Sequence, residues 1–125
     1  MANPVGQWHI NANGFKGTLN INSDGAGNLT GTVDIDAGCT DTLQGVWSET
    51  AQEIVFDRIR KQGQTTTWIQ TYTGYMFLTK EPIFQGQGPP EPNPSFRLLT
   101  GYFEALGTGA SPGRPRFGWV ARQNI

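Results

Sequence analysis

The chain has 125 residues, of which 36% are hydrophobic and 11% aromatic, and its formal net charge is −1. This length corresponds to a single compact domain, residues 1–125, with enough aromatic bulk to form a core. The near-zero charge excludes the basic surface that nucleic-acid binders present, and no apolar run is long enough for a membrane-spanning helix.

Turn signals recur along the chain, and between them polar and apolar side chains alternate with a period of two, as in half-buried β-strands. No segment combines helical periodicity with capping residues. Asn13-Gly14 favours a two-residue hairpin turn, because both turn positions require positive φ angles. The pattern predicts eight strands, in chain order Gly6–Ala12, Phe15–Asn22, Asn28–Asp36, Thr42–Glu49, Glu53–Arg60, Thr66–Leu78, Phe96–Leu106 and Arg116–Gln123.

Two longer connections are rich in Pro and Gly. Pro82–Pro94, within a loop at about residues 80–95, lies between the sixth and seventh predicted strands. Its prolines favour an extended backbone that cannot join a sheet. We interpret it as a covering surface loop, or alternatively as a lid over a binding site. Gly107–Pro115 is a second loop of this kind.

Consecutive strands with short links favour an antiparallel up-and-down meander, which loses its exposed edges when it closes into a barrel. Glycines recur inside the strands, among them Gly17, Gly45 and Gly101. Because glycine weakens a strand, its repetition indicates crowding where a strongly curved sheet bends. We therefore predict an all-β fold, an eight-stranded antiparallel up-and-down β-barrel.

Three short motifs fall at matching places in a known family of barrels. Gly6-Gln7-Trp8 opens the first predicted strand, Gly27–Val33 (GNLTGTV) covers the third, and Thr73-Gly74-Tyr75 lies in the sixth. In these motifs and in strand order, the chain resembles the avidin/streptavidin family. The resemblance implies the same eight-stranded barrel, an architecture similar to that of lipocalins.

The resemblance does not extend to biotin binding. The positions of three polar biotin ligands in that family are occupied here by Ile10, Gly14 and Val33. These residues have no side chain that can hydrogen-bond a buried ureido group, and unpaired buried polar groups are costly. The resemblance therefore implies the fold and argues against biotin as the ligand.

The alternation assigns one face of each strand to the barrel interior. Because the turns after odd-numbered strands share one end of the barrel, Arg58, Trp68 and Gln70 are predicted to meet at that mouth. An arginine among apolar and aromatic walls is typical of a small-ligand site. The candidate ligand-binding residues are Arg58, Trp68 and Gln70 at the mouth, and Tyr72, Trp47 and Trp8 deeper inside.

Two points about the interior stay open. The side chains could fill the barrel completely, with the head group of Arg58 reaching the mouth. The phase of the last strand is also ambiguous, because Phe117 and Trp119 fit the interior by size while Gly118 shares the phase of the other in-strand glycines.

Strands five to seven place apolar side chains on the outward phase, namely Val55, Ile59, Ile69, Tyr75, Phe77, Leu98 and Tyr102. Such a patch is large for the surface of a monomer. We predict a homo-oligomer that associates through this face. The alternative is that the Pro82–Pro94 loop covers it with Ile83 and Phe84.

The residues that could carry covalent or metal chemistry are few. Cys39 and His9 are the only residues of their kinds, and no cluster has the spacing of metal ligands. An enzyme that uses Glu49, Asp57 or Tyr72 as acid or base is the weakest hypothesis, since no nucleophile–base pair or carboxylate pair is recognisable. We predict no catalytic residues, no metal and no cofactor.

The sequence therefore predicts a non-enzymatic barrel that binds a small molecule. The alternative function is carbohydrate binding, or an oligomeric interaction module, through the outer surface and loops. The start of the chain shows no basic stretch followed by an apolar segment, so we expect a cytoplasmic protein.

Overall fold

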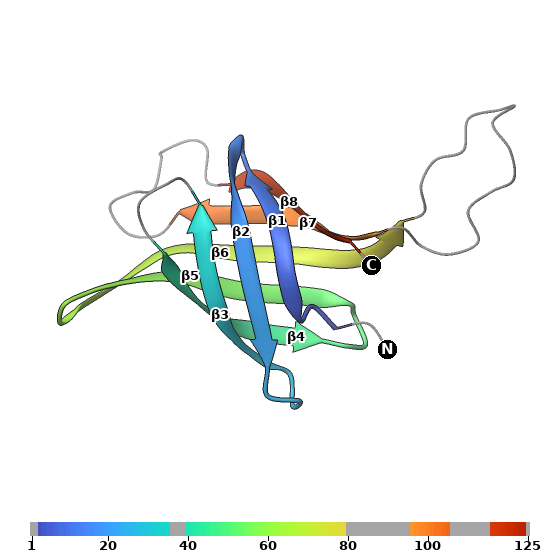
Figure 1. Ribbon diagram of the computed structural model, residues 1–125, viewed down its shortest axis with the longest axis horizontal. Coiled ribbons are helices and arrows are strands. Elements are labelled where there is room, and N and C mark those ends of the chain that lie inside the picture. The colour runs from blue at the N-terminus through green and yellow to red at the C-terminus, as the bar shows by residue number, and fades with distance from the viewer. Residues whose placement is uncertain (1–2, 36–39, 80–95, 106–115, 125) are drawn as a thin grey trace, which may run out of the picture.

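The computed structural model describes residues 3–35, 40–79, 96–105 and 116–124, and its regular structure consists of β-strands (Figure 1). The strands are β1 (Gly6–Ala12), β2 (Phe15–Ser23), β3 (Asn28–Ile35), β4 (Asp41–Ser48), β5 (Glu53–Gln62), β6 (Thr65–Thr79), β7 (Phe96–Ala105) and β8 (Arg116–Asn124). Their order matches the predicted order, and their bounds differ from the predicted bounds by two residues at most. The all-β prediction is confirmed.

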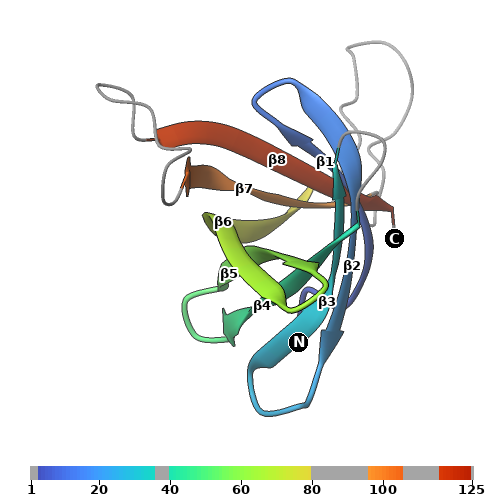
Figure 2. The same cartoon turned by 90° about the vertical axis from the view of Figure 1, so that its left-hand side faces the viewer.

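Each strand pairs antiparallel with the next, and β8 pairs with β1, so that the sheet closes into a barrel. In Figures 1 and 2, β1–β3 cross the strands of the opposite wall at a steep angle, which is the tilt that closure of a small barrel requires. The predicted eight-stranded up-and-down barrel is confirmed.

The turn between β1 and β2 has the predicted geometry. Asn13 and Gly14 both adopt positive φ, at 51° and 96°. The Gly14 N–H donates to Asn11 Oδ1 at 2.8 Å, and the Asn13 N–H donates to the Gly118 carbonyl at 2.9 Å. The second bond ties this turn to β8 and fixes its position at one end of the barrel.

The barrel core is built from every strand. Its buried members are Trp8, Ile10, Ala12, Leu19, Ile21, Leu29, Val33, Ile35, Leu43, Ile54, Phe56, Tyr72, Met76, Leu99, Phe103, Trp119 and Ala121. These side chains occupy alternate positions along their strands, so the period-two pattern directs one apolar face inward throughout.

Two in-strand glycines lie where the strands pack closely around Trp119. A Cβ atom at Gly74 would lie 2.6 Å from the Trp119 ring, and one at Gly101 would lie 2.0 Å from the Thr73 carbonyl oxygen. In this narrow space the indole N–H of Trp119 donates to the carbonyls of Thr73 and Tyr102, at 3.1 and 3.0 Å. The predicted crowding at the in-strand glycines is confirmed here.

The ambiguous phase of the last strand is resolved. Phe117 packs against the core and Trp119 is buried in it, whereas Gly118 is exposed on the outside. The size of the aromatic side chains therefore determines the phase of β8.

Cys39 and the two predicted loops, Pro82–Pro94 and Gly107–Pro115, lie outside the described residues. Within the described ranges, no helix is long and apolar enough to cross a membrane.

Candidate functional site

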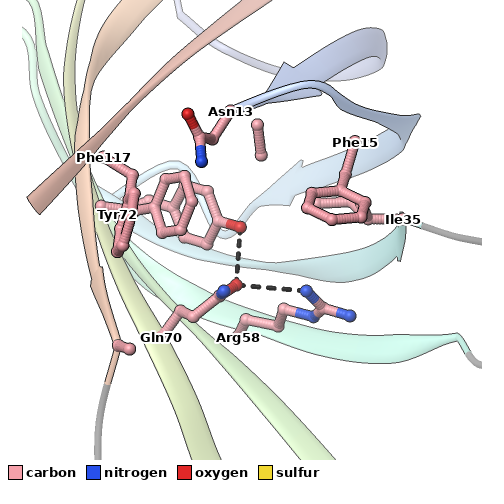
Figure 3. A pocket seen from close by; sticks show the side chains of 10 residues that line it. Asn13, Phe15, Ile35, Arg58, Gln70, Tyr72 and Phe117 are labelled. Carbon is pink, nitrogen blue, oxygen red and sulfur yellow. Dashed lines mark hydrogen bonds between the residues drawn. The ribbon is translucent and has the colours of Figure 1, made fainter. Parts of the chain in front are cut away.

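A cavity of about 390 Å³ lies at the end of the barrel that holds the β1–β2 turn (Figure 3). It is lined by Ala12, Asn13, Phe15, Ile35, Arg58, Gln70, Tyr72, Phe103, Ala105 and Phe117. Asn13 and Phe15 are exposed, so the cavity communicates with solvent. Among these lining residues, Arg58 alone is charged.

The guanidinium of Arg58 is held by a buried carboxylate. Arg58 Nε donates to Asp41 Oδ2 at 2.6 Å, and Arg60 donates to the same carboxylate through Nε at 2.9 Å and Nη2 at 3.1 Å. The side chain of Asp41 is only 1% exposed. Charge-assisted bonds of this kind are strong, and they fix the orientation of the Arg58 head group.

Two opposing effects act on the pKa of Asp41. Burial raises it, but the hydrogen bonds and charges of Arg60 and Arg58 together outweigh burial, so that the pKa lies below its ordinary value of 3.8. Asp41 is therefore a carboxylate at neutral pH, and it stabilises the two guanidinium groups beside it.

Gln70 connects Arg58 to Tyr72. Gln70 Oε1 accepts one hydrogen bond from Arg58 Nη1 at 3.1 Å and another from the Tyr72 hydroxyl at 2.7 Å, as Figure 3 shows. Burial raises the pKa of Tyr72 to about 12, although Arg58 acts in the opposite direction. The phenol is thus protonated at neutral pH, and its hydroxyl donates a hydrogen bond to Gln70.

Aromatic rings form one wall of the cavity. Tyr72, Phe103 and Phe117 pair directly across neighbouring strands. Their rings stack with centroid separations of 4.8 Å between Tyr72 and Phe103, and 5.5 Å between Phe103 and Phe117. Phe15 and Ile35 lie on the opposite side in Figure 3. The cavity therefore brings aromatic rings and oriented polar groups together.

Of the predicted site residues, the structure brings together Arg58, Gln70 and Tyr72 and places Trp68 elsewhere. Arg58 pairs with Gln70, but the next residue, Ile59, pairs with Trp68, so Ile69 is an extra residue in β6. This bulge reverses the side-chain phase. Trp68 consequently lies on the outer face with 52% of its surface exposed, and the prediction that it points into the barrel is wrong.

The other two tryptophans assigned to the site from the sequence, Trp8 and Trp47, lie toward the opposite end of the barrel. Trp8 is completely buried and donates its indole N–H to the Pro4 carbonyl at 2.8 Å. Trp47 donates its indole N–H to Glu49 at 2.7 Å, next to the β4–β5 turn. Neither residue lines the cavity, so the prediction that they form its deeper part is wrong.

Asp41 and Arg60 were not among the predicted site residues. Asp41 is the first residue of β4 and lies on the same face as Leu43, but the predicted strand began at Thr42. Extending the inward-facing alternation of β4 from Leu43 back to Asp41 would have placed a carboxylate near Arg58. A buried arginine requires such a partner.

The three candidate acid or base residues do not form a site. Glu49 accepts a hydrogen bond from Trp47 at the end of the barrel opposite the cavity. Asp57 accepts a hydrogen bond from the Thr71 hydroxyl at 2.7 Å on the outer face. Only Tyr72 lines the cavity. Among the described residues, no group of three His, Cys, Asp or Glu side chains is arranged to hold a metal ion.

A depression of about 380 Å³ lies on the outer face of β3–β6. It is lined by Asn28, Leu29, Thr30, Gln44, Gly45, Val46, Asp57 and Trp68. The exposed indole of Trp68 therefore stands beside amide, hydroxyl and carboxylate side chains.

The outer apolar face agrees only in part with its prediction. Tyr75 and Phe77 are 52% and 46% exposed, and Val55, Ile69, Leu98 and Tyr102 are partly exposed. Ile59 is only 2% exposed, so its predicted contribution to an exposed patch is wrong. It lies opposite the bulky Trp68 in the β5–β6 ladder, where directly paired side chains are in contact range.

Association through this outer face stays a prediction. We expect light scattering during size-exclusion chromatography to give a mass well above the 13.7 kDa of one chain. A double replacement of Tyr75 and Phe77 by serine should return the mass to that of a monomer, because it removes the two most exposed rings of the face. A wild-type monomer would contradict the prediction.

Comparison of the chain with protein-family models, with curated proteins and with solved structures found no match.

Proposed function

We propose that the protein is a non-enzymatic β-barrel that binds a small molecule in the cavity around Arg58, Gln70 and Tyr72. The observation that carries the proposal is the cavity itself, which has a volume of about 390 Å³ at the open end of an otherwise packed barrel. Small-ligand sites typically have a volume of roughly 300–1,000 Å³, apolar walls and a few fixed polar groups.

The polar groups of the cavity are held in place before any ligand arrives. Asp41 orients Arg58, and Gln70 accepts hydrogen bonds from both Arg58 and Tyr72. A site that is already ordered loses little conformational entropy when a ligand binds, so more of the contact energy contributes to affinity. This favours a binding function for the network over a purely structural one.

An avidin-like architecture with a different ligand is part of the proposal. Two of the positions that correspond to polar biotin ligands in the avidin family hold Ile10 and Val33, which are 3% and 0% exposed and belong to the apolar core. A ureido group at those positions would lose its hydrogen bonds to water without gaining new ones. Biotin is therefore a negative control in binding experiments.

Filling the cavity should abolish binding. Ala105 lines the cavity directly opposite Gln70, so Ala105→Trp places an indole in the open space without removing a polar group. A library compound that raises the melting temperature of the wild type, and forms a one-to-one complex in native mass spectrometry, should do neither with this variant. At a concentration one hundred times Kd, such a ligand stabilises the wild type by about 2.7 kcal/mol.

Ala51→Trp is the matched control, because Ala51 is exposed in the β4–β5 turn at the opposite end. It should bind every compound that the wild type binds. The proposal fails if no compound binds the wild type, or if Ala105→Trp binds as tightly as the control.

The outer depression supports a second candidate function, carbohydrate binding. The apolar face of a sugar ring can lie on an exposed indole while its hydroxyl groups bond to amides and carboxylates. Trp68, Asp57, Gln44 and Asn28 provide these groups on one surface.

A glycan array distinguishes the two sites. If sugars bind the outer depression, Trp68→Ala should remove the array signal, whereas Ala105→Trp should leave it unchanged. The reverse pattern would assign the sugar to the barrel mouth, and an empty array would remove this candidate.

A further inference from the structure

The polar groups of the cavity that remain unused are mainly hydrogen-bond donors. Gln70 Oε1 accepts two hydrogen bonds, and Tyr72 uses its only hydroxyl hydrogen in one of them. Among the described residues, Gln70 Nε2 and Arg58 Nη2 make no hydrogen bond. A ligand that satisfies both groups must present acceptor atoms.

The charge that faces the cavity is positive. Asp41, the carboxylate that balances Arg58, does not line the cavity and is almost completely buried. That carboxylate is also shared between Arg58 and Arg60. In a partly desolvated site, a guanidinium whose counter-charge is turned away attracts an anion and binds a carboxylate with directional hydrogen bonds.

The walls favour a flat apolar ring. Phe103 and Phe117 form a stacked surface on one side, with centroids 5.5 Å apart. On the other side Phe15 is 56% exposed, so its ring is accessible from the cavity mouth. A flat ring between these walls would cover Phe15 and stack on Phe117.

We propose that the ligand is a small aromatic carboxylate. Its carboxylate accepts hydrogen bonds from Arg58 and Gln70, and its ring lies between Phe117 and Phe15. This inference rests on the proposed binding function and adds the chemical class of the ligand to it.

Four probes test the class: benzoate, benzamide and benzamidine, which are of similar size, and the smaller acetate. Each is titrated into the full chain at pH 7 by calorimetry and by ligand-observed NMR. Benzoate should bind most tightly, by about tenfold over benzamide, because hydrogen bonds to a charged acceptor are stronger than bonds to a neutral one. Benzamidine should bind least among the aromatic probes, and acetate should bind weakly because it lacks the ring.

The sharpest variant is Gln70→Glu, which keeps the shape of the side chain. One of its carboxylate oxygens can accept the hydrogen bonds that now come from Arg58 and Tyr72, while the other replaces the Nε2 donor. This variant should lose benzoate binding by tenfold or more and gain affinity for benzamidine. Gln7→Glu on the exposed face of β1 makes the same change of net charge away from the cavity and should retain the wild-type order.

Arg58→Gln provides a second measurement if Gln70→Glu fails to fold. Asp41 keeps the hydrogen bonds from Arg60 in this variant, and the preference for benzoate over benzamide should disappear. Wild-type binding of benzamide or benzamidine as tight as that of benzoate would overturn the inference. If the four probes fail while uncharged compounds bind in a manner sensitive to Ala105→Trp, the ligand class is wrong and the binding function stands.

Discussion

Replacement of Asp41 by alanine is expected to lower the free energy of unfolding by about 3–5 kcal/mol. The substitution leaves the guanidinium of Arg58, with a side chain only 11% exposed, without the carboxylate that balances it. Arg60 is affected less, because 35% of its side chain is exposed to solvent. Urea denaturation followed by tryptophan fluorescence measures the change.

Asp34→Ala is the control for this experiment, since Asp34 lies exposed on the neighbouring strand β3. We expect it to change the free energy of unfolding by about 0.5 kcal/mol at most. The double variant Asp41→Ala with Arg58→Met should be more stable than Asp41→Ala alone, because it also removes the unpaired buried charge. Equal effects of Asp41→Ala and Asp34→Ala would mean that the buried pair contributes no net stability.

The effect of Asp41 should also depend on pH. Because the folded pKa of Asp41 lies below its unfolded value of 3.8, the carboxylate contributes its full stability above that value. The contribution disappears as the pH falls through the folded pKa. The difference between wild type and Asp41→Ala should therefore be constant near neutral pH and shrink below about pH 4. A difference that grows on acidification would contradict this account.

The fold could be predicted because its main determinants are local. Alternation of polar and apolar residues follows from the pleat of a strand, and the Asn13-Gly14 turn follows from the φ angles that its residues tolerate. The predicted division into inward-facing and outward-facing side chains is correct wherever the pairing of strands is regular. It failed at Trp68, because the bulge at Ile69 depends on how β5 and β6 fit together and leaves no mark on the alternation.

The candidate site was predictable only in part. Arg58, Gln70 and Tyr72 share a phase and lie near the correct strand ends, so the meander alone brought them together. The position of Trp8 along the barrel axis was predicted wrongly. Trp8 lies four residues before Ala12, which lines the cavity at the mouth, and four residues correspond to about 13 Å along a strand. Asp41 was missed because the requirement of a buried arginine for a counter-charge becomes visible only once burial is known.

The glycine pattern leads to a second large effect. Gly101→Ala is expected to lower the free energy of unfolding by about 3 kcal/mol, at the upper end of the range for overpacked sites. The added Cβ atom would lie 2.0 Å from the Thr73 carbonyl oxygen and 2.7 Å from Gly74 Cα. Both are backbone atoms of the paired strand β6, so no side-chain rotation relieves the clash. The strands must separate, and the bond from Trp119 to the Thr73 carbonyl, now 3.1 Å, is strained with them.

Gly118→Ala makes the same chemical change one strand away and isolates the role of crowding. Gly118 is exposed, and a Cβ atom there would have no neighbour closer than the Gly101 carbonyl oxygen at 4.0 Å. This variant should be neutral, or up to about 1 kcal/mol more stable, because alanine restricts the unfolded chain more than glycine does. If Gly101→Ala and Gly118→Ala had equal effects in urea denaturation, strand propensity and not the close approach of β6 to β7 would explain the glycines. A large difference would show that Gly101 is required by the curvature that closes the barrel around Trp119.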